Sequence, residues 1–379
     1  MFHALMKRSG STRFRSLAVV VLTTIIGIHC NGDDAGLAPS PSSDAPLTPT
    51  HDTTSTADTT SGPDTTTSGS DTTSGVDSAS TPSPPAPVPP PVSYTGLPFG
   101  PTGLWTANRL NWGPEPFTAS QNYITADTVI LQIDAARSSH QRLVLAMAGA
   151  AGQAEDYLTN GQFDMTKWMQ RMDSYRTSAI QDAVAAAVAD GTVIGNMLID
   201  EPETKRWGTV LTKAMLDQMA TYAKQIFPTL PMGVNHGPPA HTWHASERYQ
   251  VVDYVLYQYA HWVTSGDVVA WRDEVLTQAK KDGVTPMLSI NVLNGGVQDR
   301  SEAWACTGAG RAGRGTYWPN CRMTPDQVRE WGSALAPYGC YLMLWRFDRE
   351  YMSDPANQEA FKAIAAQAAS LPSRSCRRQ

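Results

Sequence analysis

Along residues 94–379, short apolar runs alternate with longer stretches in which apolar residues recur at helical spacing. The short runs, bounded by Gly, Pro, Asn and Asp, predict β-strands, and the helical spacing predicts amphipathic helices. The predicted strands are Thr102–Trp105, Arg142–Ala148, Ile194–Asp200, Pro231–Asn235, Val252–Tyr259, Pro286–Val292 and Cys340–Arg346. The predicted helices are Ala126–Ser139, Thr166–Ala189, Thr212–Ile226, Val268–Lys281, Pro325–Ala336 and Asn357–Ser370. This alternation implies right-handed crossovers and a parallel sheet.

A closed barrel needs eight strands, one more than these runs supply. We place the eighth as a short strand within residues 149–193, an interval that also carries two helical patterns. An open, doubly wound sheet is the alternative, but no glycine-rich phosphate loop follows the first strand. The pattern therefore favours an α/β fold, a single (β/α)8 TIM-type barrel.

The first 93 residues differ from the barrel region in composition. Residues 1–30 hold four basic residues and no acid ahead of the apolar run 16–28, which is the form of a secretory signal and is short for a membrane span. Residues 31–93 are almost entirely Ser, Thr, Asp, Pro, Gly and Ala. Such a segment cannot bury enough apolar area to offset its ordering entropy. We therefore predict a signal at 1–30, a disordered linker at 31–93 and one barrel domain at 94–379.

The five cysteines point to an oxidising, extracytoplasmic location. Cys30 closes the signal where a bacterial lipoprotein carries its lipidated cysteine, although His29 stands where a small residue is usual. We expect a secreted protein at the cell surface, anchored to the membrane through a lipid on Cys30. The remaining even number suits disulfides. The local pairing joins Cys306 to Cys321 and Cys340 to Cys376, and two other pairings are possible.

The net charge excludes one class of partner. The whole chain carries −6, but the linker holds eight Asp and the first thirty residues hold four basic side chains, which leaves the barrel region at −2. A nearly neutral domain has no electrostatic footprint for nucleic acid or an anionic membrane. We expect no nucleic-acid partner and a monomer.

Polar and aromatic residues gather where the predicted strands end, whereas the strand interiors are aliphatic. Residues at the carboxyl ends of parallel strands form the site in barrels and in open α/β sheets. Asp200 and Glu201 are adjacent acids at such an end, and a carboxylate flanked there by aromatic residues is placed to act as a general acid. The other predicted site residues are Trp105, Asn235, His236, Gln258, Tyr259, Asn291, Trp345, Arg346 and Asp348.

The run Leu198-Ile-Asp-Glu-Pro202 resembles the Asn-Glu-Pro signature that ends the fourth strand of (β/α)8-barrel glycoside hydrolases of the cellulase and mannanase type. Tyr254–Tyr259 is similar to the sixth strand of that family, and Leu342–Trp345 to its final strand. The resemblance implies an extracellular hydrolase of polysaccharides with Glu201 as general acid/base. It also implies that Trp345 forms the floor of a sugar subsite, and it implies no cofactor.

The chain departs from that family at the nucleophile, a Glu at the end of the seventh strand, because Leu288–Gly296 contains no acid. A retaining mechanism needs a second carboxylate at ~5 Å, and a wider gap would give inversion. Acids on nearby loops could supply it: Asp348, Asp299, Glu302, Glu155 and Asp156. The adjacent Asp200 and Glu201 also resemble the pair of substrate-assisted N-acetylhexosaminidases. In those enzymes the Asp orients the 2-acetamido group that attacks the anomeric carbon, and Tyr259 would hold the acetamido oxygen.

Less specific interpretations compete with these. Asp200 and Glu201 could cap the helix that follows them. The barrel could bind carbohydrate without cleaving it. His241 and His244 share a spacing that permits a metal, but it matches neither the zinc protease motif nor a His-x-His site. We therefore expect no metal, and we expect His236 to bond substrate hydroxyls.

Overall fold

The computed structural model describes residues 94–104, 116–149, 151–237, 244, 246–261, 267–296 and 321–378, and of residues 151–153 it describes the backbone only. The signal, the linker, Trp105 and Cys306 lie outside these ranges. What the sequence predicts for them stays a prediction.

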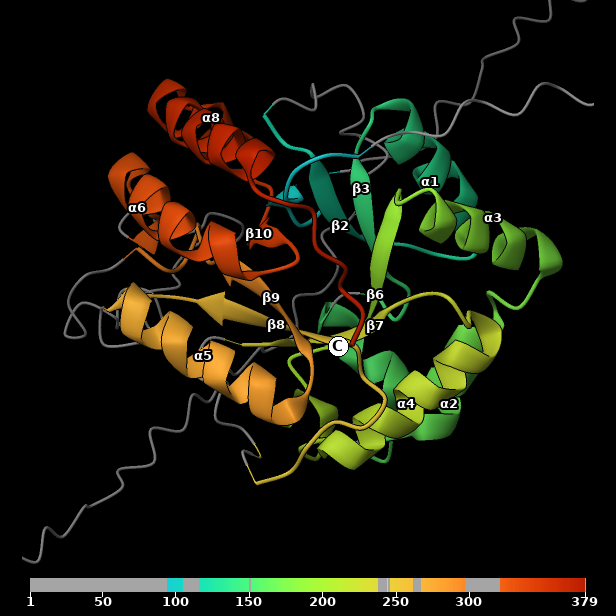
Figure 1. Ribbon diagram of the computed structural model, residues 1–379. Coiled ribbons are helices and arrows are strands. Elements are labelled where there is room, and N and C mark those ends of the chain that lie inside the picture. The colour runs from blue at the N-terminus through green and yellow to red at the C-terminus, as the bar shows by residue number, and fades with distance from the viewer. Residues whose placement is uncertain are drawn as a thin grey trace, which may run out of the picture. The chain divides into compact units, whose positions relative to one another are not determined.

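Eight parallel strands form the central sheet, in the order β1-β10-β9-β8-β7-β6-β3-β2. They are β1 (Phe99–Pro101), β2 (Ala119–Tyr123), β3 (Arg142–Ala146), β6 (Val193–Asp200), β7 (Met232–His236), β8 (Tyr254–Tyr259), β9 (Thr285–Ile290) and β10 (Leu342–Leu344). The two end strands are joined by a parallel bridge between Thr102 and Gln121 and by a bond from the Thr118 N–H to the Phe99 carbonyl (2.8 Å). The sheet thus closes into a barrel (Figure 1), which confirms the predicted (β/α)8 fold class.

Helices surround the barrel and connect successive strands (Figure 1). They are α1 (Val129–Ser138), α2 (Met165–Asp173), α3 (Ser178–Ala189), α4 (Lys213–Ile226), α5 (Val268–Asp282), α6 (Pro325–Leu335), α7 (Arg349–Ser353) and α8 (Pro355–Ser370), with short 3-10 helices η1 (Ala151–Tyr157), η2 (Lys205–Trp207) and η7 (Ala336–Tyr338). Polar N-caps mark several starts, and Thr324 forms a capping box with Gln327 at α6. Of the helices in the described ranges, none is both long and apolar enough to cross a lipid bilayer.

Two strand predictions are corrected by the structure. The first strand is β1, just before the predicted 102–105. The eighth strand is β2, whereas residues 149–193 hold α2, α3 and a two-stranded antiparallel hairpin outside the barrel, β4 (Leu158–Thr159) with β5 (Gln162–Phe163). The β2 sequence Ala-Ser-Gln-Asn-Tyr lacks an apolar run. Its polar side chains are nevertheless buried, because neighbours satisfy them: Ser120 Oγ donates to the Pro101 carbonyl (2.8 Å).

Alternate strand residues fill the barrel interior. On β8, Tyr257 packs in the large cluster beneath the helices, whereas Tyr254 belongs to a separate cluster with Ala119, Val144, Leu256, Met287, Tyr341 and Met343. Gly195 on β6 and Gly233 on β7 give the Tyr254 ring its space. A Cβ on these glycines would lie 2.7 and 2.1 Å from ring carbons, so only glycine fits there.

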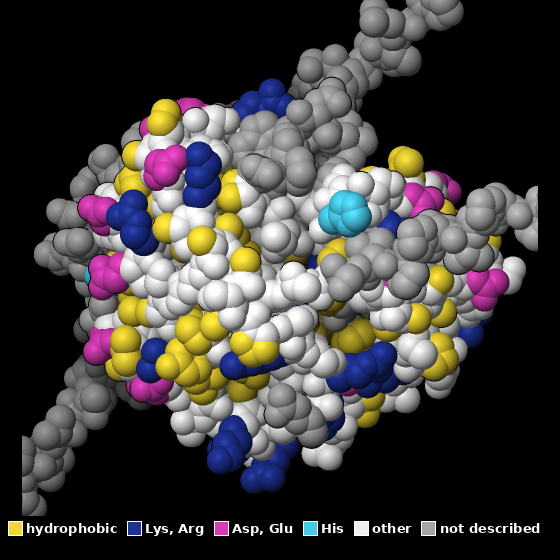
Figure 2. Space-filling model, turned by 45° about the horizontal axis from the view of Figure 1, so that its top comes forward, with side chains coloured by type: hydrophobic (Ala, Val, Ile, Leu, Met, Phe, Trp, Pro, Cys, Tyr) yellow, Lys and Arg dark blue, Asp and Glu magenta, His cyan; other side chains and the backbone are white. Residues whose placement is uncertain are grey.

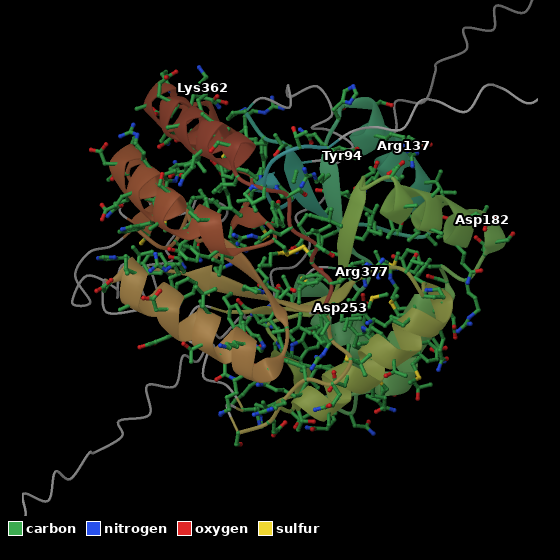
Figure 3. All side chains as sticks on the ribbon, in the orientation of Figure 1. Tyr94, Arg137, Asp182, Asp253, Lys362 and Arg377 are labelled. Carbon is green, nitrogen blue, oxygen red and sulfur yellow. A yellow bond between two sulfur atoms is a disulfide. The ribbon has the colours of Figure 1, made fainter. Side chains whose placement is uncertain are left out.

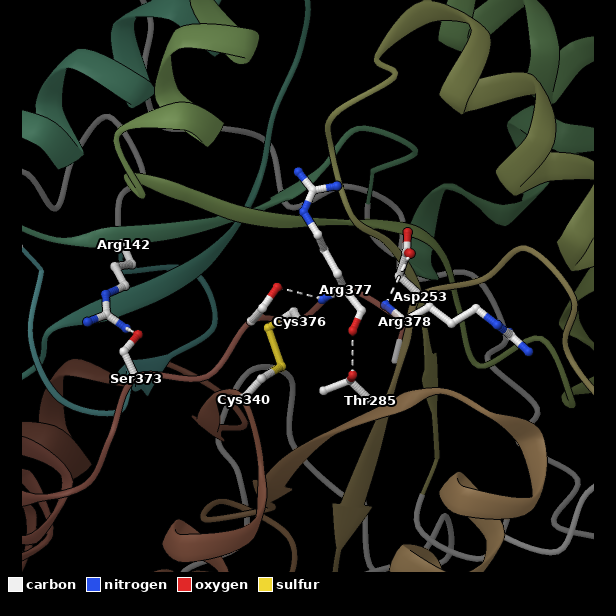
Figure 4. The surroundings of a disulfide bond; sticks show 9 residues. Arg142, Asp253, Thr285, Cys340, Ser373, Cys376, Arg377 and Arg378 are labelled. Carbon is white, nitrogen blue, oxygen red and sulfur yellow. Dashed lines mark hydrogen bonds between the residues drawn. A yellow bond between two sulfur atoms is a disulfide. The ribbon is translucent and has the colours of Figure 1, made fainter.

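The segment 371–378 crosses the amino ends of the strands, which we call the barrel bottom. A disulfide joins Cys376 to Cys340, as the local pairing predicts. The segment's hydrogen bonds to strand starts include Arg142 Nη1 to Ser373 Oγ (3.0 Å), Thr285 Oγ1 to the Arg377 carbonyl (2.6 Å) and the Arg378 N–H to Asp253 Oδ1 (3.2 Å) (Figure 4). Figure 3 places Asp253 and Arg377 near the middle of the strand ring, whereas Arg137, Asp182 and Lys362 lie on surrounding helices.

Cys321 is disulfide-bonded as well. Its predicted partner, Cys306, lies outside the described residues. On the surface, Lys, Arg, Asp and Glu side chains are interspersed over the face seen in Figure 2. This mixture agrees with the small net charge of the barrel region.

Candidate active site

The carboxyl end of β6, the fourth barrel strand, turns sharply at Glu201. Glu201 has a φ of +46°, in the left-handed region that costs a non-glycine residue on the order of 1–3 kcal/mol. Its N–H donates to the Asn235 carbonyl (2.8 Å). Its own carbonyl accepts from the Thr204 N–H (3.1 Å), Thr204 Oγ1 (2.8 Å) and Trp207 Nε1 (3.1 Å). These bonds hold the strained residue in place.

The acidic pair does not cap the following helix. Helix α4 begins at Lys213, and its N-cap is Thr212, whose Oγ1 accepts from the Met215 N–H (3.2 Å). Residues 202–212, which include η2, separate the pair from that helix. The capping interpretation of Asp200 and Glu201 is therefore wrong.

The two adjacent carboxylates have different surroundings. Glu201 Oε2 forms an ion pair with Arg206 Nη2, and the two side chains are 24% and 30% exposed. Asp200 lies deeper, and its Oδ1 accepts a hydrogen bond from Asn235 Nδ2. Loss of hydration on burial raises the pKa of Asp200; Arg206 and Asn235 oppose this rise, and the negative charge of Glu203 adds to it. Both acids are partly buried, and they differ in their partners: an arginine for Glu201 and an amide for Asp200.

A third carboxylate, that of Glu203, belongs to the same group. Its Oε2 is 3.0 Å from His236 Nδ1, and its Oε1 accepts from the Gly237 N–H (2.6 Å). The other ring nitrogen of His236 is 3.0 Å from the Tyr249 hydroxyl. Burial raises the pKa of Tyr249 well above its ordinary value, so the phenol keeps its proton.

Gly237 locates the carboxylates of Glu201 and Glu203 relative to each other. A Cβ built on Gly237 would lie 3.2 Å from Glu201 Oε1 and 2.9 Å from Glu203 Oε1. Both oxygens therefore face the same point, just past the end of β7. Glycine at this position leaves room for both.

Sequence reasoning missed three members of this group. Glu203 and Arg206 follow the acidic pair within five residues, so the third acid of Asp-Glu-Pro-Glu was the available signal. Tyr249 gives no such signal, because it comes from the loop before β8 and enters the group only through the fold. His236 lies in the group, as predicted, but its bonds are to Glu203 and Tyr249.

A second polar pair lies at the ends of β8 and β9. Asn291 Nδ2 donates to Gln258 Oε1 (3.0 Å), and Asn291 Oδ1 accepts from the Asn294 N–H (3.0 Å). Both predicted side chains are buried, at 4% and 5% exposed. The structure thus brings Gln258 and Asn291 together at the same end of the barrel as Glu201.

Two other predicted site residues, Tyr259 and Asp348, make contacts outside this group. The Tyr259 ring contacts Trp271 of α5 and Trp331 of α6, on the helix side of the sheet. Asp348 is the N-cap of α7, and its Oδ1 accepts from the Tyr351 N–H (2.9 Å). Tyr259 therefore packs against the helices, and Asp348 caps α7.

The end of β10 carries two further predicted residues. The Trp345 ring is partly buried and packs against the apolar clusters. The guanidinium carbon of Arg346 lies 5.9 Å from that ring's centre, and Arg346 is exposed. This distance allows a cation–π contact between the two side chains.

The described residues offer no metal centre: within those ranges, no three or more His, Cys, Asp or Glu are grouped so as to hold an ion. His241 lies outside the described residues. His244 Nδ1 is 2.6 Å from Glu247 Oε1.

No protein-family model matches the chain, and no curated protein matches it. Solved structures do. An endo-β-1,4-mannanase from Thermotoga petrophila is 11% identical, with a TM-score of 0.43 over 73% of this chain and 77% of that one. A GH10 xylanase from termite gut is 10% identical, with a TM-score of 0.45 over 72% and 76%. Xylanase 10B from Thermotoga maritima is 10% identical, with a TM-score of 0.40 over 72% and 95%.

Proposed function

We propose that the protein is an extracellular glycoside hydrolase that cleaves polysaccharide, with Glu201 as general acid/base. The observation that carries the proposal is the strained, multiply bonded backbone of Glu201 at the carboxyl end of a barrel strand. Proteins retain such strain where a side chain must be aimed. The carboxylate is partly exposed and, since α4 has its own cap, has no capping task.

The neighbours of Glu201 suit proton transfer at a glycosidic oxygen. The Arg206 guanidinium stabilises the ionised carboxylate, which is the form that a general base requires. Donation requires the protonated form. A bound sugar that displaces water from the site, and draws Arg206 to a hydroxyl, would favour that form.

Asn235 supports carbohydrate as the ligand. It is 6% exposed, and its Oδ1 has no hydrogen-bond partner among the residues that the structure describes. A buried amide oxygen without a donor costs about 1–3 kcal/mol, which a substrate hydroxyl can recover by donating to it. Gln258 and Asn291 add a bonded amide pair at the neighbouring strand ends.

Substrate assistance by a 2-acetamido group is the second candidate. The position of Asp200 directly before Glu201 favours it, because a carboxylate there can accept the N–H of an acetamido group and orient the acetamido oxygen for attack. Tyr259, whose ring lies on the helix side, does not supply the acetamido contact in this arrangement.

The test is release of reducing ends by the purified protein from a panel of neutral and 2-acetamido polysaccharides. We expect Glu201→Gln to lower the rate by a factor of ~100 or more. Glu247→Gln is the matched control, because Glu247 pairs with His244 rather than with the site. A wild-type protein that binds a glycan but cuts none would support a binding protein without catalysis.

We also propose that the protein is a secreted lipoprotein anchored through Cys30. The Cys340–Cys376 disulfide supports an oxidising compartment. Expressed from its own signal, the wild type should fractionate with membranes and Cys30→Ser should be soluble outside the cytoplasm. Equal membrane binding of the two would contradict the anchor.

A further inference from the structure

We propose that Glu203 is the second carboxylate of the reaction and that it acts as the nucleophile of a retaining mechanism. This inference rests on the proposed function and fills the role that the acid-free end of β9 leaves open. Three observations carry it: the distance between Glu203 and Glu201, the bonds that hold Glu203, and a buried polar atom beside the pair.

Distance favours retention. Glu201 Oε1 and Glu203 Oε1 lie 3.2 and 2.9 Å from one point, the Cβ position of Gly237, so the two oxygens are at most about 6 Å apart. Retaining pairs are separated by about 5–5.5 Å, whereas inverting pairs need about 6.5–9.5 Å to admit a water. The spacing therefore fits direct attack by a carboxylate.

The bonds of Glu203 suit a nucleophile. Each of its oxygens lies within hydrogen-bonding distance of a nitrogen, His236 Nδ1 or the Gly237 N–H. When the Tyr249 hydroxyl donates to His236 Nε2, the ring proton lies on Nδ1 and is donated to Glu203. Two N–H donors stabilise a carboxylate anion and fix its direction. The side chain is 11% exposed, which leaves the carboxylate accessible from one side.

The third observation is Asn235. Its Nδ2 donates to Asp200 and its carbonyl accepts from the Glu201 N–H. Its buried Oδ1, which has no hydrogen-bond partner among the described residues, therefore lies beside the carboxylate group. A sugar hydroxyl that donates to this oxygen would bring its ring beside Glu201 and Glu203. Acidic side chains alone would not indicate a ligand, but this atom requires a donor that the described residues do not supply.

The chemistry then takes two steps. Glu203 attacks the anomeric carbon, the glycosidic C–O bond breaks, and Glu201 gives its proton to the leaving oxygen. Water next attacks the anomeric carbon, Glu201 takes the proton of that water, and the ester bond to Glu203 breaks. Both carboxyl groups return to their starting forms, and the product keeps the anomeric configuration of the substrate.

The first experiment uses the full-length protein and the polysaccharide that it cuts fastest in the panel. Proton NMR of the first product should show retention. The 2,4-dinitrophenyl 2-deoxy-2-fluoro glycoside of the same sugar should add one fluoroglycosyl unit, and peptide mapping should place it on Glu203. Inversion, or a label on any other residue, would overturn the inference while leaving hydrolysis established. A wild-type protein that cuts none of the polysaccharides would contradict both the proposed hydrolase function and the role of Glu203.

Two variants separate attack from positioning. Glu203→Gln can keep an acceptor for the Gly237 N–H, so it should fold as judged by circular dichroism and lose a factor of ~100 or more in rate. Glu203→Ala should regain turnover on the dinitrophenyl glycoside as azide is added, with a glycosyl azide of inverted configuration as product. A merely structural Glu203 would give no azide product, and that result would contradict the proposal.

Discussion

The two ends of the barrel are built on different principles. At the carboxyl end, Glu201 is held in a strained conformation, Asp200 is a partly buried acid with a raised pKa, and Asn235 Oδ1 has no partner within the described ranges. At the barrel bottom, the segment 371–378 is joined to residues at the starts of strands by hydrogen bonds and one disulfide. If the proposed function holds, the comparison teaches that stability and chemistry are assigned to opposite ends, a division that barrels allow because loops and strand starts vary independently.

The largest effect on stability should come from removing the disulfide at the barrel bottom. Replacing Cys340 and Cys376 together by Ser releases a loop that spans 36 positions. The unfolding free energy should fall by roughly 3–4 kcal/mol, as measured by urea denaturation. The rate on polysaccharide should stay within about twofold, since no carboxylate of the site moves. A comparable loss of rate in the folded variant would break the division between the two ends.

A smaller effect is expected at Asp348, which the sequence analysis counted among catalytic candidates. Removal of the α7 cap by Asp348→Ala should cost about 1 kcal/mol of stability and little activity. Thermal unfolding and the reducing-end assay measure both quantities. A rate loss like that of Glu201→Gln would return Asp348 to the catalytic group.

The smallest effect concerns pH. Because the pKa of Asp200 is raised in the folded state, the carboxyl group is neutral at low pH and does not lower the stability there. As the pH rises from about 4 through the folded pKa, ionisation of Asp200 progressively lowers the unfolding free energy. Asp200→Asn removes that dependence. The melting temperature of the variant, relative to wild type, should therefore be higher at pH 7.5 than at pH 4. An equal difference at the two pH values would mean that Asp200 titrates normally.

The sequence predicted seven barrel strands at or next to their places, because buried parallel strands are apolar runs. The site at their carboxyl ends stays a prediction. The sequence analysis missed β2, whose Ser120 and Asn122 are buried only because neighbours bond them. The local sequence pattern of β2 does not predict these hydrogen-bond partners.

Site residues were harder to predict than strands. Side chains alternate between the two faces of a strand, so an error of one position in the predicted register places the Tyr259 side chain on the wrong face. In the structure it faces the helices. The Glu203 contacts with His236 and Gly237 join a loop to a strand end 33 and 34 positions away. Sequence spacing cannot fix such pairings, so Glu203 is visible in the sequence as a third acid but its contacts with His236 and Gly237 are not.

The bonds of segment 371–378 also bear on biosynthesis. This segment leaves the ribosome after all eight strands, yet Arg378 bonds to Asp253, 125 positions earlier, and Arg377 to Thr285, 92 positions earlier. A nascent chain that has been synthesised only through its last strand still lacks the bonds that segment 371–378 makes at the barrel bottom. The hydrogen bonds at the barrel bottom can therefore form only after this segment has been translated.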